Sequence, residues 1–316
     1  MILGWVLALV AGIVVAAYAS RRAVDRALDV ADRLDLSTGL VGVTIVAIGT
    51  DLPEIANSIS SSVTGHGDVN VGNATGSTLT QITLILAILA IRFPALRTDG
   101  SDDRRPVELP IGLMTVAATV LIAVLIIDEH LSRADGALLV GVWVASMFLV
   151  NRWQQTSHLL TNVSERRGKL GVWRLLGWLA LVAGSATVVV QAFVRISDEI
   201  GVPELVASTV VLALGTSLPE LVVDWTALRR GAAALAVGDL FGSSLVDASL
   251  AIGIGPLIRP TVVSGQAVPS VLVVAAGVAA ATFVWRYRRA GSAVPAMALL
   301  AVYGVCMAAI IGIGSI

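Results

Sequence analysis

The chain has 316 residues, of which 56% are hydrophobic and only 14% are charged, and its mean hydropathy is +0.89. This composition excludes an ordinary soluble domain, and the single cysteine excludes a disulfide framework or a thiolate metal cluster. The net charge of −1 says nothing about partners, because here the distribution of charge matters more than its sum.

Apolar runs close to 20 residues recur along the whole chain, and each is long enough to cross a hydrocarbon core about 30 Å thick. We therefore predict an all-α polytopic membrane protein with ten transmembrane helices. The first run has no basic residue before it and no cleavage pattern, so we expect a retained helix, followed at 21–36 by an interfacial helix. The predicted spans are 2–20, 39–64, 70–91, 107–127, 134–150, 172–194, 203–228, 236–258, 262–285 and 293–315.

Basic residues alternate between the loops. Eighteen of the 21 Lys and Arg residues follow odd-numbered spans, and only Arg133, Arg195 and Arg259 lie on the other side. The positive-inside rule then places both termini outside a plasma membrane. A cytoplasmic connecting loop at 151–171 joins a first half, 1–150, to a second half, 172–316, and is too short for a folded regulatory domain.

An internal duplication connects the two halves. The motif Gly-Thr-Asp-Leu-Pro-Glu at 49–54 recurs at 215–220 as Gly-Thr-Ser-Leu-Pro-Glu, and 13 of the 40 positions in 49–88 match those in 215–254 without a gap. The repeat motifs occupy 39–91 and 203–258. Because span 2 runs outward and span 7 runs inward, the sequence predicts two inverted five-helix repeats, an arrangement typical of transporters.

A proline breaks each copy of the motif. Pro53 has no N–H and clashes with the preceding turn, so the carbonyl of Gly49 loses its helical partner, and Pro219 does the same to Gly215. We therefore predict that helices 2 and 7 are broken. A freed carbonyl inside a bilayer needs another partner, such as a bound cation.

Oxygen donors surround both predicted breaks. Four of them are carboxylates near the centres of their spans, and no Lys or Arg occurs in these spans. Each central charge costs roughly 2.5–3.5 kcal/mol, so the four together cost on the order of 10 kcal/mol, comparable to the stability of a whole domain. Bound cations or protons must therefore neutralise them, and oxygen donors without His or Cys favour Ca²⁺, Na⁺ or Mg²⁺ over Zn²⁺ or Cu⁺. The donors are Thr50, Asp51, Glu54, Ser77, Gln81, Thr216, Ser217, Glu220, Ser243 and Asp247.

The duplicated Gly-Thr-Ser-Leu-Pro-Glu and Gly-Asp-x-x-Gly-Ser-Ser motifs resemble the α-repeats of the calcium:cation antiporter superfamily, in particular its sodium/calcium exchangers. The resemblance covers essentially the whole chain. It implies a secondary antiporter that exchanges Ca²⁺ for Na⁺ by alternating access. It implies no enzyme activity and no cofactor: the substrates are inorganic cations, the surroundings are the lipid bilayer, and neither a nucleic acid nor a protein partner is indicated.

The resemblance also implies roles for individual residues. Glu54 and Glu220 would be central Ca²⁺ ligands, shared with Na⁺, and Asp247 stands where the family has Asn or Asp. The main-chain carbonyls of Ala47 and Ala213 would line outer Na⁺ sites. Further oxygens would come from Thr50, Thr216, Ser217, Ser77 and Ser243.

Two positions depart from the family pattern. Asp51 replaces the usual Ser, and Gln81 replaces an Asn and is one methylene longer. Because four carboxylates exceed the charge of one Ca²⁺, we expect Asp51 or Asp247 to be protonated in some transport states. A divalent cation exchanger coupled to H⁺ or to another monovalent ion is therefore the alternative.

Two other classes of membrane protein also use buried acids. An intramembrane aspartyl protease is disfavoured, because Val237 and not Gly stands two residues before Asp239. A protease also needs no duplicated Pro-Glu. A channel with acidic rings would need several subunits around one pore. Among the remaining polar residues, Asp224 is expected in a solvated vestibule. Asn73 and Asp239 are as well explained by helix N-capping as by ion contact.

Overall fold

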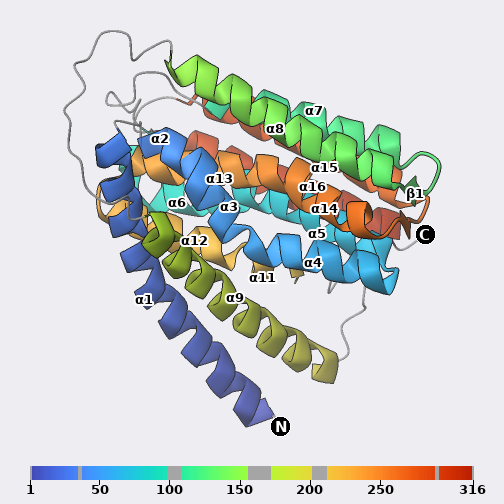
Figure 1. Cartoon of the computed structure of the whole chain (residues 1–316), viewed down its shortest axis with the longest axis horizontal. Helices are drawn as coiled ribbons and strands as arrows, with labels where there is room; N and C mark the ends of the chain where they lie inside the picture. The colour runs from blue at the N-terminus through green and yellow to red at the C-terminus, as the bar shows by residue number, and fades with distance from the viewer. Residues whose placement is uncertain are drawn as a thin grey trace.

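The computed structural model describes residues 2–34, 38–97, 108–155, 172–200, 212–288 and 292–314. Long helices lie side by side in a bundle, while α1 and α9 pack together at one edge, at an angle to the rest (Figure 1). A short antiparallel ladder pairs β1 (His130–Leu131) with β2 (Thr261–Val262). The helical elements are α1 (Ile2–Leu34), α2 (Thr38–Val41), η1 (Gly42–Val46), α3 (Ala47–Thr50), α4 (Leu52–Thr64), α5 (Gly67–Thr80), η2 (Gln81–Ile85), α6 (Leu86–Arg92), η3 (Pro94–Arg97), α7 (Glu108–Leu125), α8 (Arg133–Gln155), α9 (Val172–Ile200), α11 (Ala213–Thr216), α12 (Leu218–Arg229), α13 (Ala233–Val246), η5 (Asp247–Ala251), α14 (Ile252–Ile258), α15 (Ala267–Arg286) and α16 (Val294–Gly314).

Six helical segments among the described residues are long and apolar enough to cross a membrane, and a bent pair makes a seventh. The six are 67–92, 108–125, 133–152, 233–258, 267–286 and 294–313, and the bent pair is 38–50 with 52–64. These agree with seven of the predicted spans. The predicted spans 2–20 and 172–194 fall within α1 and α9.

Three predicted boundaries differ from the structure or extend outside the described residues. The span expected from residue 262 begins at Ala267, because Val262 belongs to the strand ladder. Helix α8 continues to Gln155, into the loop expected at 151–171, and the rest of that loop lies outside the described residues. Residues 203–211 of the predicted seventh span also lie outside them.

The prediction of a separate interfacial helix at 21–36 was wrong. The stretch up to Leu34 continues α1, whose 33 residues extend about 50 Å. Its apolar side chains, including Ala23, Val24 and Ala27, are buried. Helix α1 packs against α9 and α12, and Asp25 pairs with Arg230 just after α12. The apolar face that suggested a membrane surface is covered by protein instead.

The second and seventh predicted spans are both interrupted at the residue that precedes Leu-Pro. Asp51 has φ −79° and ψ 9°, and Ser217 has φ −80° and ψ 8°, values in the sparsely populated bridge region. Pro53 and Pro219 follow in the first turns of α4 and α12, where a missing N–H is tolerated. The axis bends by 44° at Asp51. The proline-based prediction of a break is confirmed at both positions.

Corresponding elements of the two halves begin and end at equivalent positions of the two repeats. Elements α3, α5, η2 and α6 in the first half match α11, α13, η5 and α14 in the second. In Figure 1 the path from α3 to α4 runs from left to right, whereas the path from α11 to α12 runs from right to left. The two π-helical turns, η2 and η5, begin at Gln81 and Asp247, and such turns often occur at functional positions.

Glycines bring the backbones of the first half and of α13 into direct contact. A Cβ atom on Gly238 would lie 2.3 Å from the carbonyl oxygen of Gly39, and one on Gly42 would lie 2.4 Å from that of Leu235. Small residues permit this close approach of helices in membranes. The approach places side chains of α13 beside the break in the first half.

Candidate functional site

Four fully buried carboxyl groups meet where the two broken helices approach each other. Asp51 lies at the break before α4, and Glu54 lies in the first turn of that helix. Glu220 occupies the equivalent turn of α12, and Asp247 begins the π-helical turn after α13. Each of the four is at most 1% exposed. All four acids are therefore enclosed by protein and do not face the outer surface of the bundle.

Three of the four carboxyl groups are close enough to share one ion. Asp51, Glu54 and Asp247 each present an oxygen, and these oxygens lie within 4.8 Å of one another. Ligands on opposite sides of Ca²⁺ are separated by about 5 Å, because each Ca²⁺–oxygen distance is about 2.3–2.6 Å. The carboxyl group of Glu220 adjoins that of Asp51. The cluster therefore has the size and the donor type of a site for a hard cation.

The ends of two helices favour negative charge at this point. Glu54 and Glu220 lie in the first turns of α4 and α12, where unpaired N–H groups carry a partial positive charge. Half-helix ends of this kind stabilise anionic groups inside membrane transporters. They offset only part of the charge of four carboxylates, so a cation or protons are still required.

Hydroxyl groups link the two halves in reciprocal pairs. Thr50 lies 3.3 Å from Ser243, and Thr216 lies 3.1 Å from Ser77, measured between the hydroxyl oxygens. The same relation holds for the glutamates, since Thr50 adjoins Glu220 and Thr216 adjoins Glu54. Each pair combines one residue from a break with one from the opposite half, so both repeats are needed to complete the site.

The remaining predicted donors also lie at the breaks or on the adjoining helices. Ala47 and Ala213 are buried, and their carbonyl oxygens accept the backbone N–H groups of Asp51 and Ser217 at 3.0 and 3.1 Å. The hydroxyl of Thr50 lies 3.1 Å from the carbonyl oxygen of Ala47, and that of Ser77 lies 3.5 Å from the carbonyl oxygen of Ala213. Gln81 accepts a hydrogen bond from Ser244 at 3.1 Å and adjoins Asp247. The hydroxyl of Ser217 is buried without a hydrogen-bond partner among the described residues.

The structure contradicts the vestibule expected for Asp224 and excludes helix N-capping for Asp239 and Asn73. Asp224 is 0% exposed and so does not lie in a solvated vestibule. Asp239 and Asn73 are not N-caps, because α13 begins at Ala233 and α5 at Gly67. Asp239 instead accepts a hydrogen bond from Thr50 at 3.5 Å, and Asn73 accepts one from Thr216 at 3.2 Å.

A periodicity in the sequence could have revealed that Asp239 and Asn73 face the site. Asp239, Ser243 and Asp247 are spaced at every fourth position and therefore share one face of a helix. In the first half, Asn73, Ser77 and Gln81 have the same spacing. A residue on the face that carries two site residues is expected to point toward the site as well.

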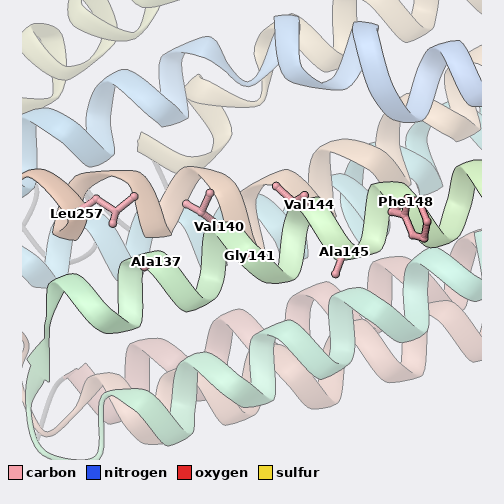
Figure 2. Close-up of a pocket in the computed structure, with 7 residues that line it drawn as sticks. All are labelled: Ala137, Val140, Gly141, Val144, Ala145, Phe148 and Leu257. Atoms are coloured by element: carbon pink, nitrogen blue, oxygen red, sulfur yellow. The ribbon is translucent and has the colours of Figure 1, made fainter.

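The outer surface of the bundle carries a pocket of a different kind. It lies along α8 beside α14, and its lining is apolar, as Figure 2 shows for Val140, Val144, Phe148 and Leu257. No carboxylate or hydroxyl lines this pocket. It therefore offers no ligand to a cation and is separate from the buried acidic cluster.

Comparisons with known proteins identify the family of this chain. The sodium/calcium exchanger protein family matches residues 4–151 and 170–312, so the chain belongs to that family. The putative antiporter CaxA of Alkalimonas amylolytica is 31% identical over 266 residues, which is 81% of each chain. The sodium/calcium exchanger MaX1 of Methanosarcina acetivorans is 26% identical over 299 residues and is covered over 83% of its length, against 80% of this chain.

Solved structures show the same fold. A structure of the sodium-calcium exchanger NCX_Mj, from a crystal soaked with Na⁺ and Sr²⁺, superposes with a TM-score of 0.76 at 23% sequence identity. The match covers 98% of this chain and 99% of that one. Fold and family together make this protein a multi-pass membrane cation antiporter, a transporter whose ions are substrates and not cofactors.

Proposed function

We propose that this protein exchanges Ca²⁺ for Na⁺ across the plasma membrane by alternating access. The observation that carries the proposal is the cluster of Asp51, Glu54, Glu220 and Asp247, which is buried at the meeting point of two broken helices. No Lys or Arg occurs in the four spans that supply these acids. A mobile cation is the natural countercharge for such a cluster.

The ligands divide into a central and an outer set. Glu54 and Glu220 bind Ca²⁺ centrally and also serve Na⁺, because each projects from one half into the shared site. Asp51 and Asp247 set the net charge of the site, because either can be ionised or protonated. The outer set binds Na⁺ through hydroxyl, amide and main-chain oxygens, supplied by Thr50, Thr216, Ser217, Ser77, Ser243, Gln81, Ala47 and Ala213.

The architecture in this proposal has ten spans in two inverted five-helix repeats, with both termini outside. Elements that recur at equivalent positions of the two repeats and run in opposite directions in Figure 1 support it. The first half, 1–150, and the second, 172–316, each supply one broken helix. Residues of each half complete the site of the other, as the reciprocal hydroxyl pairs do.

Helices α1 and α9 are the moving elements in this mechanism. They pack mainly against each other at the edge of the bundle, and α9 touches the break directly, because a Cβ atom on Gly49 would lie 2.5 Å from the side chain of Leu179. A shift of this pair against the remaining helices would open the site to one side and close it to the other.

Coupling to protons is the second candidate, and Asp51 favours it. One Ca²⁺ balances two of the four central carboxylates, and Asp51 and Glu220 adjoin each other. Two ionised carboxylates offer no donor to one another, so a proton or a monovalent ion must accompany Ca²⁺. A proton on Asp51 would both reduce the negative charge and supply the donor that the adjoining carboxylate of Glu220 lacks.

A flux experiment tests the proposal. Purified protein is reconstituted into liposomes, and uptake of ⁴⁵Ca²⁺ is measured under imposed Na⁺, K⁺ or pH gradients. We expect uptake driven by an outward Na⁺ gradient. Uptake driven only by a pH gradient would transfer the assignment to the proton-coupled alternative, and the absence of gradient-driven uptake would refute Ca²⁺ as the substrate.

A further inference from the structure

A second pair of acids lies beside the central cluster, on the α12–α13 side. Asp224 lies one helical turn after Glu220 on α12, so the two share a helical face. Asp239 precedes Asp247 by two turns, or about 12 Å along α13. Both Asp224 and Asp239 are 0% exposed, and their carboxyl groups face each other.

The pair has few partners of its own. One oxygen of Asp239 accepts a hydrogen bond from Thr50 at 3.5 Å. Its other oxygen and both oxygens of Asp224 have no hydrogen-bond partner among the described residues. Burying a polar group without a partner costs several kcal/mol, and a charged group costs far more. These facing oxygens therefore need a bound cation, or a proton shared between the two carboxyl groups, that no neighbouring side chain in the described part of the chain supplies.

The equivalent positions in the first half show that the fold does not need acids here. Ser58 corresponds to Asp224, and Asn73 corresponds to Asp239. Ser58 accepts the backbone N–H of Gly255 at 3.2 Å, and Asn73 accepts the hydroxyl of Thr216 at 3.2 Å. Neutral side chains thus satisfy this place in one repeat, whereas the other repeat has two carboxylates with unmet oxygens.

We propose that Asp224 and Asp239 form a second binding site for Ca²⁺, distinct from the central cluster. Two carboxylates balance the two charges of the ion, and the hydroxyls of Thr50 and Ser243 border Asp239 and add oxygens of the type that Ca²⁺ prefers. The identity of the ion rests on the function proposed above, but the existence of the site rests on the unmet oxygens.

The position of the pair suggests its use. It lies between the central cluster and the turn that joins α12 to α13. Arg229, at the end of α12, and Arg230, in the turn, make this end cytoplasmic in the proposed orientation. Glu220 interacts with both acids of the pair. An ion that leaves the central cluster toward the cytoplasm therefore meets this second site next, whereas the outward side has only neutral residues at the matching positions.

Equilibrium binding of ⁴⁵Ca²⁺ to the purified full-length protein in detergent tests the site. The key variant is D224S/D239N, which gives the second half the residues of the first. Glu54→Gln is the matched variant for the central cluster. We expect two Ca²⁺ per chain for the wild type and one for each variant. If the double variant does not fold, as judged by gel filtration, Asp224→Asn replaces it.

The outcomes separate this inference from the proposed function. Two bound ions in D224S/D239N would overturn the second site. The second site would also be overturned if the wild type bound one ion, D224S/D239N still bound one and Glu54→Gln bound none. That result would leave the proposed function intact. A wild type that binds no Ca²⁺ would overturn both. A single ion that is lost only in D224S/D239N would support the second site and refute the central assignment.

Discussion

At four equivalent buried positions the two halves of this protein differ in charge. The first half has Asp51 where the second has Ser217, but in the other three places the second half carries the acid. There Ser58, Asn73 and Gln81 correspond to Asp224, Asp239 and Asp247. With one glutamate in each half, the first half supplies two of these buried acids and the second supplies four.

This difference shows which interactions build the fold and which set its chemistry. At the site, neutral and reciprocal hydroxyl contacts join the halves, namely Thr50 with Ser243 and Thr216 with Ser77. They do not depend on where the acids lie. The charges are added to a common backbone, and their uneven distribution makes the two approaches to the site electrostatically different.

The largest effect is expected at Glu54 and Glu220, which are equivalent positions that carry an acid in both halves. Glu54→Gln and Glu220→Gln should each lower Ca²⁺ flux in proteoliposomes at least about 100-fold, because removing one charged partner of a buried ion costs about 3–5 kcal/mol. Equal losses would mean that the two repeats contribute alike at the centre. A variant that keeps more than half of the wild-type flux would remove that glutamate from the ligand set.

Next comes the close contact between the halves. Gly238→Ala places a methyl group 2.3 Å from the backbone carbonyl oxygen of Gly39, which cannot rotate away. We expect a loss of about 1–3 kcal/mol in stability, measured as a lower melting temperature in detergent. Gly141→Ala is the control, since nothing lies within 4 Å of its Cβ position. Equal melting temperatures for the two variants would contradict the packing described here.

Sequence alone predicted the broken helices because their cause is local. A proline removes one N–H wherever it occurs, and the gapless duplication tied the second break to the first. The central acids followed from their depth in apolar runs. The burial of Asp224 did not follow, because it depends on how α12, α13 and the first half pack together. The prediction for α1 beyond residue 20 failed for the same reason: its apolar face has a protein neighbour that no local pattern reveals.

A smaller effect is expected where only the first half carries the acid. Protons compete with Ca²⁺ for carboxylates, so lowering the pH should reduce exchange by the wild type. Asp51→Asn removes one competing group, and we expect a flatter pH profile and a several-fold change in the preference for Na⁺ over H⁺ as the coupling ion. Ser217→Ala, at the equivalent position, should leave the profile unchanged. If Asp51→Asn alters neither the pH profile nor the ion preference, Asp51 has no part in coupling.

The smallest expected effect concerns a neutral pair that is reciprocal in its backbone contacts but not in its side-chain partners. The hydroxyl of Thr78 lies 3.4 Å from the carbonyl oxygen of Ser244, and the hydroxyl of Ser244 lies 3.5 Å from the carbonyl oxygen of Thr78. Ser244 also lies 3.1 Å from the side-chain oxygen of Gln81.

Polar contacts between membrane helices contribute about 0.6 kcal/mol each, so Thr78→Val should lower the free energy of unfolding by about that amount. Ser244→Ala should lower it by about 1 kcal/mol, because it also leaves a buried amide oxygen without its partner. Melting temperatures of the two variants in detergent measure the difference, with Gly141→Ala again as the control. Equal losses would show that the amide of Gln81 is satisfied elsewhere. A larger loss in Ser244→Ala would show that the asymmetry between the halves extends from charge to hydrogen bonding.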